Sequence, residues 1–362
     1  MFTLLSRRSL KCFQLTALNC RTFTESFSKS RGNVYAVENL TQRGLLKVQG
    51  VDVHNFLQGL ITNDIRHLES MNSIYTLFLN VKGRVMCDTI IYKTREENVL
   101  LIECDSSYIH LLQKHLKLYR VRRKIDIDVA DDKLKVWVFY RPIDELDFSQ
   151  GKVSYAKDIV SHETLGFYSH RDDVIICRDP RVAALGYRVV APVDEIVRDT
   201  FARELGGSSL YDGFLNYRVH RYVLGIGEGI CDLPPGVSFP LEANSDYLHG
   251  VSVHKGCYIG QELTARTHHT GVVRKRLMPV FFRSKPEIEI PSDAPIHLLD
   301  SSKKSVGKLR AVEGKVGLGL LRVTEAIAAK NITVMGIIGE TCKPQWWPQE
   351  APKDRLSVSR EA

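Results

Sequence analysis

One cysteine of this 362-residue chain stands between two glycines, in the run Lys-Gly-Cys-Tyr-Ile-Gly-Gln-Glu that begins at Lys255. Gly256 and Gly260 permit tight turns or a positive φ, so they predict that Cys257 lies in a loop and not in a packed element. A thiolate ligates metals and attacks electrophiles, and neighbouring positive charge such as that of Lys255 favours it. The alternative is that Cys257 is a small buried apolar residue, as most free cysteines are.

The residues that follow the cysteine predict the start of a helix. Gln261 and Glu262 open the run Gln-Glu-Leu-Thr-Ala-Arg, which is suited to a helical turn. The carboxylate of Glu262 would then lie near the positive end of the helix dipole, where acids are stabilising.

The eight-residue run resembles the signature Lys-Gly-Cys-Tyr-x-Gly-Gln-Glu of the YgfZ-type proteins, with all seven specified positions present. These proteins are relatives of the T-protein (aminomethyltransferase) of the glycine cleavage system, and they act in iron–sulfur protein maturation. The resemblance is strongest to the mitochondrial iron–sulfur cluster assembly factors of that family. It implies that Cys257 is the working thiolate and that Lys255 tunes its charge. It also implies that Tyr258, Gln261 and Glu262 shape the loop and its hydrogen bonds.

The first 31 residues differ in composition from the rest of the chain. They carry six Lys and Arg residues against one Glu, so +5 of the net charge of +8 lies there. Basic, Ser-rich and acid-poor leaders are typical of organellar transit peptides, whereas a secretory signal needs an uninterrupted apolar core. We therefore predict a mitochondrial transit peptide over residues 1–32 and a location in the matrix, with an untargeted tail as the alternative. The remaining +3 does not favour binding to nucleic acid.

Composition and cysteine spacing exclude several other classes. The chain is 44% hydrophobic and 25% charged, as in ordinary globular proteins, and no apolar run approaches the roughly 18 residues of a membrane span. Six widely spaced cysteines lie outside the leader without a C-x-x-C pair. Such spacing predicts neither a disulfide framework nor a complete zinc or cluster site within one chain. A metal at Cys257 would need ligands from another molecule.

Short strands and helices alternate after the leader. Residues 34–49 predict two paired strands, and the apolar spacing of residues 53–61 predicts a helix with His54 and Asn55 on its exposed side. Residues 75–92 predict a strand, a turn and a second strand.

A helix is predicted over residues 106–118, followed by the basic run Tyr119–Lys124, which holds four positive charges in six residues. Such a run most often forms a solvated face, and a partner-docking surface is the minority alternative.

The order of residues along these elements again resembles the aminomethyltransferase-like folate-binding domain. Where T-proteins carry two adjacent acids on the second strand of the hairpin, this chain has Cys87 and Asp88. Where T-proteins carry an acid that helps to hold the pterin, this chain has Asp179-Pro180-Arg181. The resemblance therefore implies the fold, while the lost acids argue against tetrahydrofolate as a cofactor.

An amphipathic helix is predicted over residues 211–224, with Arg218 and Arg221 on the side opposite its buried stripe. In the family this helix lines a central cavity, so the two arginines are candidate anion contacts, with plain surface arginines as the alternative. The residues proposed for a folate site or cavity are Asn80, Arg84, Asp88, Arg218 and Arg221.

The pattern becomes β after Arg276. Strands are predicted at residues 277–283, 296–299, 305–312, 316–322 and 332–337, and this spacing predicts a small antiparallel barrel. The expected domains are therefore an aminomethyltransferase-like domain over residues 33–275, a barrel over 276–347 and a disordered tail over 348–362.

Together these observations predict an α+β fold: a folate-binding domain in two intertwined lobes and a C-terminal barrel, arranged as a ring around a central cavity. The function that the resemblance implies is late maturation of [4Fe–4S] proteins, without catalytic residues. The protein, a monomer on its own, would share a cluster at Cys257 with an A-type iron–sulfur cluster carrier. One alternative is a tetrahydrofolate-dependent aminomethyl- or methyltransferase that uses Asp88. Another is a folate-dependent scaffold in which Cys257 is structural.

Import into mitochondria should remove roughly the first 20–35 residues, because their composition is that of a transit peptide. Mass spectrometry of the protein from isolated mitochondria measures its N-terminus. Recovery of an intact Met1 end from the matrix would contradict the prediction.

Overall fold

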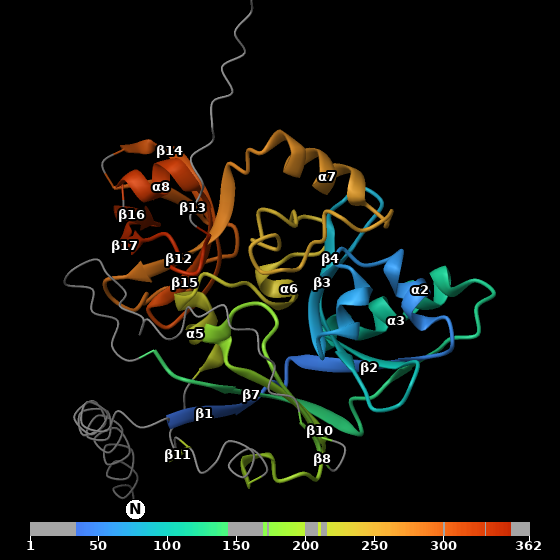
Figure 1. Cartoon of the computed structure of the whole chain (residues 1–362). Helices are drawn as coiled ribbons and strands as arrows, with labels where there is room; N and C mark the ends of the chain where they lie inside the picture. The colour runs from blue at the N-terminus through green and yellow to red at the C-terminus, as the bar shows by residue number, and fades with distance from the viewer. Residues whose placement is uncertain are drawn as a thin grey trace, which may run out of the picture.

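Two open β-sheets and one closed barrel make up most of the computed structural model (Figure 1). The residues that it describes are 34–143, 169–171, 174–199, 209–210, 216–299, 301–329 and 331–348. The predicted leader, most of residues 144–173, the first residues of the predicted helix at 211–224 and nearly all of the predicted tail lie outside these ranges.

The first sheet has five strands in the order β3-β4-β5-β2-β6, and all neighbours are antiparallel. Its strands are β2 (Arg43–Gln49), β3 (Ser73–Leu79), β4 (Val85–Lys93), β5 (Val99–Asp105) and β6 (Asp126–Val129). The predicted hairpin over residues 75–92 is confirmed, since β3 pairs with β4. Three short 3₁₀ turns are described elsewhere in the chain, at Ile65–Glu69, Ser106–Tyr108 and Ala183–Leu185.

Two helices, α2 (Val53–Gln58) and α3 (Ile109–Arg120), cover one face of the first sheet. There Phe56 and Leu112 pack with Leu46 and Ile102 of the sheet. Successive strand residues point to opposite faces, so Leu45 joins a second core, which also contains residues of the other sheet and the barrel. Both faces are buried, which explains why these strands are nearly continuous apolar runs.

The second sheet has the order β11-β1-β7-β10-β9-β8. Its strands are β1 (Val34–Asn39), β7 (Leu134–Tyr140), β8 (Ser169–Arg171), β9 (Val174–Arg178), β10 (Tyr187–Pro192) and β11 (Ser209–Leu210). The two lobes are intertwined, as predicted, because the chain starts in this sheet, builds the first sheet and then returns.

The predicted pairing of the two strands within residues 34–49 is wrong. β1 pairs with β7 and β11, whereas β2 pairs with β5 and β6. The chain crosses from one sheet to the other at Leu40, which is buried and whose N–H donates to the Val136 carbonyl. A buried leucine at the connection explains why no hairpin forms there.

The C-terminal barrel is closed and antiparallel, in the order β12-β15-β14-β13-β16-β17, which confirms the predicted architecture. Its strands are β12 (Lys275–Phe282), β13 (Pro295–Leu298), β14 (Ser301–Glu313), β15 (Val316–Arg322), β16 (Asn331–Val334) and β17 (Ile337–Thr341), with α8 (Val323–Ala329) after β15. The prediction missed β17, because Met335 and Gly336 take positive φ values and form a turn inside the run predicted as one strand.

Helix α5 (Tyr217–Val223) packs between the second sheet and the barrel, and a short helix, α6 (Gly229–Asp232), follows it. The prediction that Arg221 lies on an outer side of this helix is wrong, because Arg221 is buried. Its guanidinium lies 2.9 Å from the Asp232 carboxylate. A helix covered from two directions leaves no solvent face for that side chain.

A buried network of ion pairs connects the two sheets and the α5–α6 segment. Arg188 of β10 contacts Glu103 of β5 at 3.2 Å, Asp179 at 3.1 Å and also Glu228. Arg181 lies 2.6 Å from Asp179 and 2.8 Å from Glu228. Burial alone would raise the pKa of Glu228, but the surrounding arginines outweigh burial and hold this pKa well below its ordinary value. The predicted ring around a central cavity stays a prediction.

Replacing His220 by Gln should flatten the pH dependence of folding stability between pH 6.5 and 4. Burial lowers the pKa of His220 to about 4, and its Nε2 lies 2.8 Å from the Ala184 carbonyl oxygen. Between these pH values the unfolded chain binds more protons than the folded protein, so stability falls as the pH falls, by about 3 kcal/mol from this residue. Urea titrations at both ends of this window measure the difference. If the free energy of unfolding changed equally with pH in the wild type and the variant, the lowered pKa of His220 would be contradicted.

Candidate functional site

Cys257 is exposed in the loop that leads into helix α7 (Gln261–Thr270), in agreement with its predicted position. Gly256 is exposed as well, and a methyl group added to it would meet no other atom within 4 Å. The tip of the loop therefore projects from the protein. The residues on either side of this tip are fixed by hydrogen bonds and close packing.

Lys255 clamps the loop to the end of α2. Its ammonium donates hydrogen bonds to the backbone carbonyl oxygens of Gln58, Ile61 and Asn63, each at 2.7 Å. An ammonium has three N–H donors, so all of them are used. Burial lowers the pKa of Lys255 to about 8. The geometry gives Lys255 a holding role, and its predicted effect on the charge of the Cys257 thiolate stays a prediction.

Tyr258 and Gln261 close the loop on the other side of the cysteine. The Tyr258 N–H donates to the Gln261 side-chain oxygen at 3.0 Å, and the Gln261 N–H donates to the Tyr258 carbonyl. The Tyr258 ring lies 5.0 Å from the Lys255 ammonium, within the range of a cation–π contact. Glu262 is exposed in the first turn of α7, where its carboxylate interacts favourably with the positive end of the helix dipole.

Gly260 allows the loop to approach the β3–β4 hairpin closely. It begins α7 with a φ of 78°, a conformation that favours glycine. A Cβ at this position would lie 2.4 Å from the Asn80 carbonyl oxygen, a distance that no side chain tolerates. Gly83 at the hairpin turn packs in the same way against the Gly260 carbonyl. The backbone at Gly260 is therefore in direct contact with the backbone of the β3–β4 hairpin.

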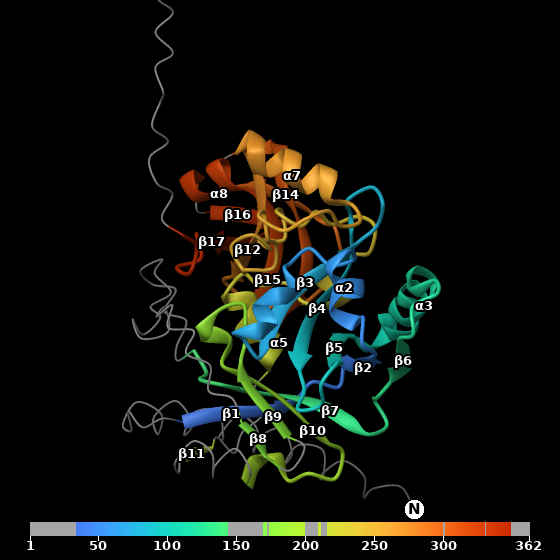
Figure 2. The same cartoon turned by 45° about the vertical axis from the view of Figure 1, so that its right-hand side comes forward.

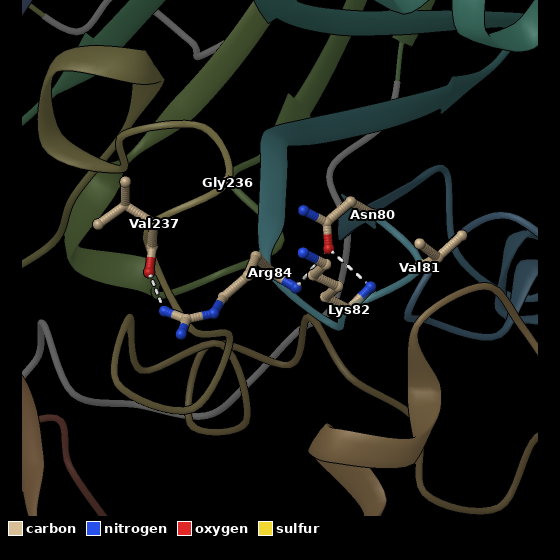
Figure 3. Close-up of a pocket in the computed structure, with 6 residues that line it drawn as sticks. All are labelled: Asn80, Val81, Lys82, Arg84, Gly236 and Val237. Atoms are coloured by element: carbon tan, nitrogen blue, oxygen red, sulfur yellow. Dashed lines mark hydrogen bonds between the residues drawn. The ribbon is translucent and has the colours of Figure 1, made fainter.

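An open cleft of about 490 Å³ lies on the hairpin beside this contact (Figure 3). It is lined by Asn80, Val81, Lys82, Arg84, Gly236 and Val237. The Asn80 side-chain oxygen accepts hydrogen bonds from the N–H groups of Lys82 and Arg84 and so shapes the turn. Arg84 donates to the Val237 carbonyl at 2.7 Å and lies 3.6 Å from the centre of the Phe239 ring.

The five residues predicted for a cavity do not gather in one place. Asn80 and Arg84 line the open cleft, while Asp88 and Arg221 are buried next to the ion-pair network. Arg218 is half-buried and lies 3.7 Å from Glu313 of the barrel.

Asp88 is held in the interior by two neighbours. Its carboxylate accepts a hydrogen bond from the Gly229 N–H at 2.9 Å and lies 3.3 Å from the Arg43 guanidinium. Burial raises the pKa of Asp88, although Arg43 opposes this effect. Arg84 does not contact Asp88, since it contacts Val237 and Phe239 instead. Burial also raises the pKa of the neighbouring Cys87 thiol well above its ordinary value, so this sulfur stays protonated at neutral pH.

Sequence reasoning missed two features of the site. The carbonyls that hold Lys255 belong to the backbone, which is present at every position and leaves no sequence signal. The partners of the ion-pair network, in contrast, left a signal: Arg43, Glu103 and Arg188 are charged residues within apolar strand runs. Among the described residues, no group of three His, Cys, Asp or Glu side chains is placed to hold a metal ion.

Comparison with known proteins agrees with the fold. Residues 25–136 match the GCVT N-terminal domain, and residues 274–349 match the CAF17 C-terminal beta-barrel domain. The crystal structure of glycine cleavage system aminomethyltransferase T from Bartonella henselae is similar over 85% of each chain, with a TM-score of 0.61 and 15% sequence identity. The fold is therefore that of the aminomethyltransferases, as predicted.

Two relatives establish the family. The chain is 38% identical over 332 residues to the iron–sulfur cluster assembly factor IBA57, mitochondrial, of Homo sapiens, covering 88% of this chain and 86% of the relative. It is 35% identical over 335 residues to the protein of that name from Mus musculus, covering 88% and 87%. The chain belongs to the IBA57 family of mitochondrial iron–sulfur cluster assembly factors.

Replacing Lys255 by Met should loosen the Cys257 loop. Three partly buried carbonyl oxygens lose their charged donor, and a loss of about 2 kcal/mol of local stability corresponds to roughly thirtyfold faster amide exchange. Hydrogen–deuterium exchange of residues 253–260 measures this effect. Lys285→Met removes an exposed lysine and serves as the matched control. Unchanged exchange in the Lys255 variant would contradict the clamp.

Proposed function

We propose that this protein acts in the mitochondrial matrix in the late maturation of [4Fe–4S] proteins, and that it holds a cluster jointly with an A-type cluster carrier. The observation that carries the proposal is the position of Cys257. It is an exposed thiol at the tip of a loop that hydrogen bonds of Lys255 and Tyr258 hold on either side. A fixed, projecting thiol can reach a cluster that another protein holds, without any pocket of its own.

The chemistry of the cluster requires a second protein. Clusters are usually bound by four thiolates, and among the described residues no group of three His, Cys, Asp or Glu side chains is placed to hold a metal ion. The cluster is therefore cargo, with one ligand from Cys257 and the others from the carrier. Because bonds to the metal would supply most of the binding free energy, the complex should be weak without the cluster and tight with it.

The surroundings of Asp88 support assembly rather than aminomethyl transfer. A transferase that used this carboxylate would need it accessible, yet Asp88 is buried against Arg43 and the Gly229 N–H. Tetrahydrofolate fits these residues poorly for a related reason. The interior acids Asp179 and Glu228 are already paired with arginines, so neither presents a free carboxylate to a pterin. The proposed function therefore needs no folate.

Replacing Cys257 by Ser should abolish the shared cluster and the cluster-dependent association with an A-type carrier. The fold should persist, because the sulfur of an exposed loop residue contributes little to core packing. Lys255→Ala should weaken both effects less than Cys257→Ser, since Lys255 does not bond the metal. Size-exclusion chromatography with visible absorption, with and without anaerobically loaded cluster, measures the complex.

Cys231→Ser is the matched control, because Cys231 is the other exposed cysteine among the described residues. It should retain the coloured complex. If Cys257→Ser co-elutes with coloured carrier at wild-type levels, Cys257 is structural and the proposal fails.

A further inference from the structure

Aliphatic side chains are exposed at the end of α3 and beside it. Leu118 and Val121 are 72% and 75% exposed, and Val51, in the turn before α2, is 89% exposed. Leu111 lies two helical turns before Leu118 on the same face and is also exposed. These residues contribute nothing to the core beneath α3.

Two segments far apart in the sequence, the turn before α2 and the end of α3 with the turn after it, form this exposed tip of the first sheet. The backbone of Gly50 packs directly on the turn after α3: a Cβ on Gly50 would lie 2.3 Å from the Lys124 carbonyl oxygen. Arg123 also donates to the Asp52 carboxylate at 2.8 Å. Val51 is therefore held beside the turn that carries Val121. In both views α3 and this turn lie at the outer margin of the first sheet (Figures 1 and 2).

Val121 keeps its exposed position at a cost in backbone strain. Its φ of 53° and ψ of −109° place it at the second position of a turn closed by a 3.0 Å hydrogen bond from the Arg123 N–H to the Arg120 carbonyl. These angles are those of a type II′ turn, in which this position favours glycine. A β-branched residue with a positive φ is a genuine outlier. No burial of the isopropyl group offsets the strain, so the folded monomer gains nothing from valine there.

Unpaired cations surround the aliphatic side chains. Lys114 lies on the face of Leu111 and Leu118, and Lys117, Arg122 and Lys124 are exposed nearby. Within the described part of the chain none of these four has an ion-pair partner, whereas Arg123 pairs with Asp52. The acids of the adjacent strand β6, Asp126 and Asp128, alternate with Ile127. Since Ile127 is buried on the side that α3 covers, both carboxylates point to the opposite face of the sheet.

We propose that this tip docks the protein on an anionic membrane surface. Val51, Leu118 and Val121 would enter the headgroup region while the four cations contact lipid phosphates. A projecting aliphatic tip surrounded by unpaired cations suits a bilayer interface, where apolar contact and charge attraction add together. A stable protein interface, in contrast, needs about 800 Å² of complementary surface on each partner, and the aliphatic part of this tip consists of four side chains. No described helix is long and apolar enough to cross a membrane.

Vesicle sedimentation of the full chain tests the proposal, with phosphatidylcholine alone and with added phosphatidylglycerol, at low and high salt. The wild-type protein should bind only the anionic vesicles, and high salt should weaken binding. Val121→Gly should lower the partition coefficient by about tenfold, because it removes an inserted side chain. The same change should raise the melting temperature by relieving strain, so misfolding cannot explain the loss. The double variant Lys117→Glu, Lys124→Glu should lose binding more fully.

Met335→Gly is the matched control. Met335 is another exposed apolar residue with a positive φ, at a turn of the barrel, and its replacement should leave vesicle binding unchanged. Because the leader is itself basic, hydrogen–deuterium exchange must locate the contact. Protection over residues 110–125 supports the proposal. Protection confined to residues 1–32, equal binding by the Val121→Gly protein, or no binding to anionic vesicles would overturn it and leave the tip as a contact for an acidic protein.

Discussion

The fold depends on one buried guanidinium, that of Arg188. It lies between the two sheets, and its partners Glu103, Asp179 and Glu228 come from three separate segments of the chain. A buried ion pair does not by itself stabilise a protein much, but the loss of one partner leaves a charge uncompensated and costs about 3–5 kcal/mol. The observed placement of the sheets pairs Arg188 with all three acids. A shift of one lobe against the other would separate Arg188 of the second sheet from Glu103 of the first.

This network also explains why an aminomethyltransferase fold need not keep an aminomethyltransferase site. Positions such as Asp88 and Arg181 are used inside the protein to balance charge, so they are not presented to a substrate. In the proposed function the chemistry lies at the surface instead, at Cys257 in a loop held by Lys255, Gln261 and close backbone packing at Gly260. An exposed thiol in a loop that is held on both sides would suit a protein that passes cargo to or from a partner.

The sequence predicted the features that depend on local pattern. The barrel strands and the hairpin follow from alternation and turn residues, and the exposure of Cys257 follows from its flanking glycines. The prediction failed where distant segments decide the outcome. Arg221 has the helical position of a surface residue, and only the packing of a second sheet and a barrel around α5 buries it. The separation of β1 from β2 depends on Leu40, whose burial requires both sheets. The three acceptors of Lys255 are backbone atoms and carry no residue signature.

The clamp on the cysteine loop limits which side chain can occupy position 255. Three carbonyl oxygens converge on the Lys255 nitrogen at 2.7 Å, which is also how backbone carbonyls replace the water around a potassium ion in selective channels. The planar fork of an arginine cannot direct its N–H groups to three such converging oxygens, so Arg is no substitute for Lys at this position. If the side chain is shortened, the three oxygens lose the one donor that they share. They must then accept hydrogen bonds from water or move apart, so the attachment of the loop to α2 depends on a single nitrogen atom.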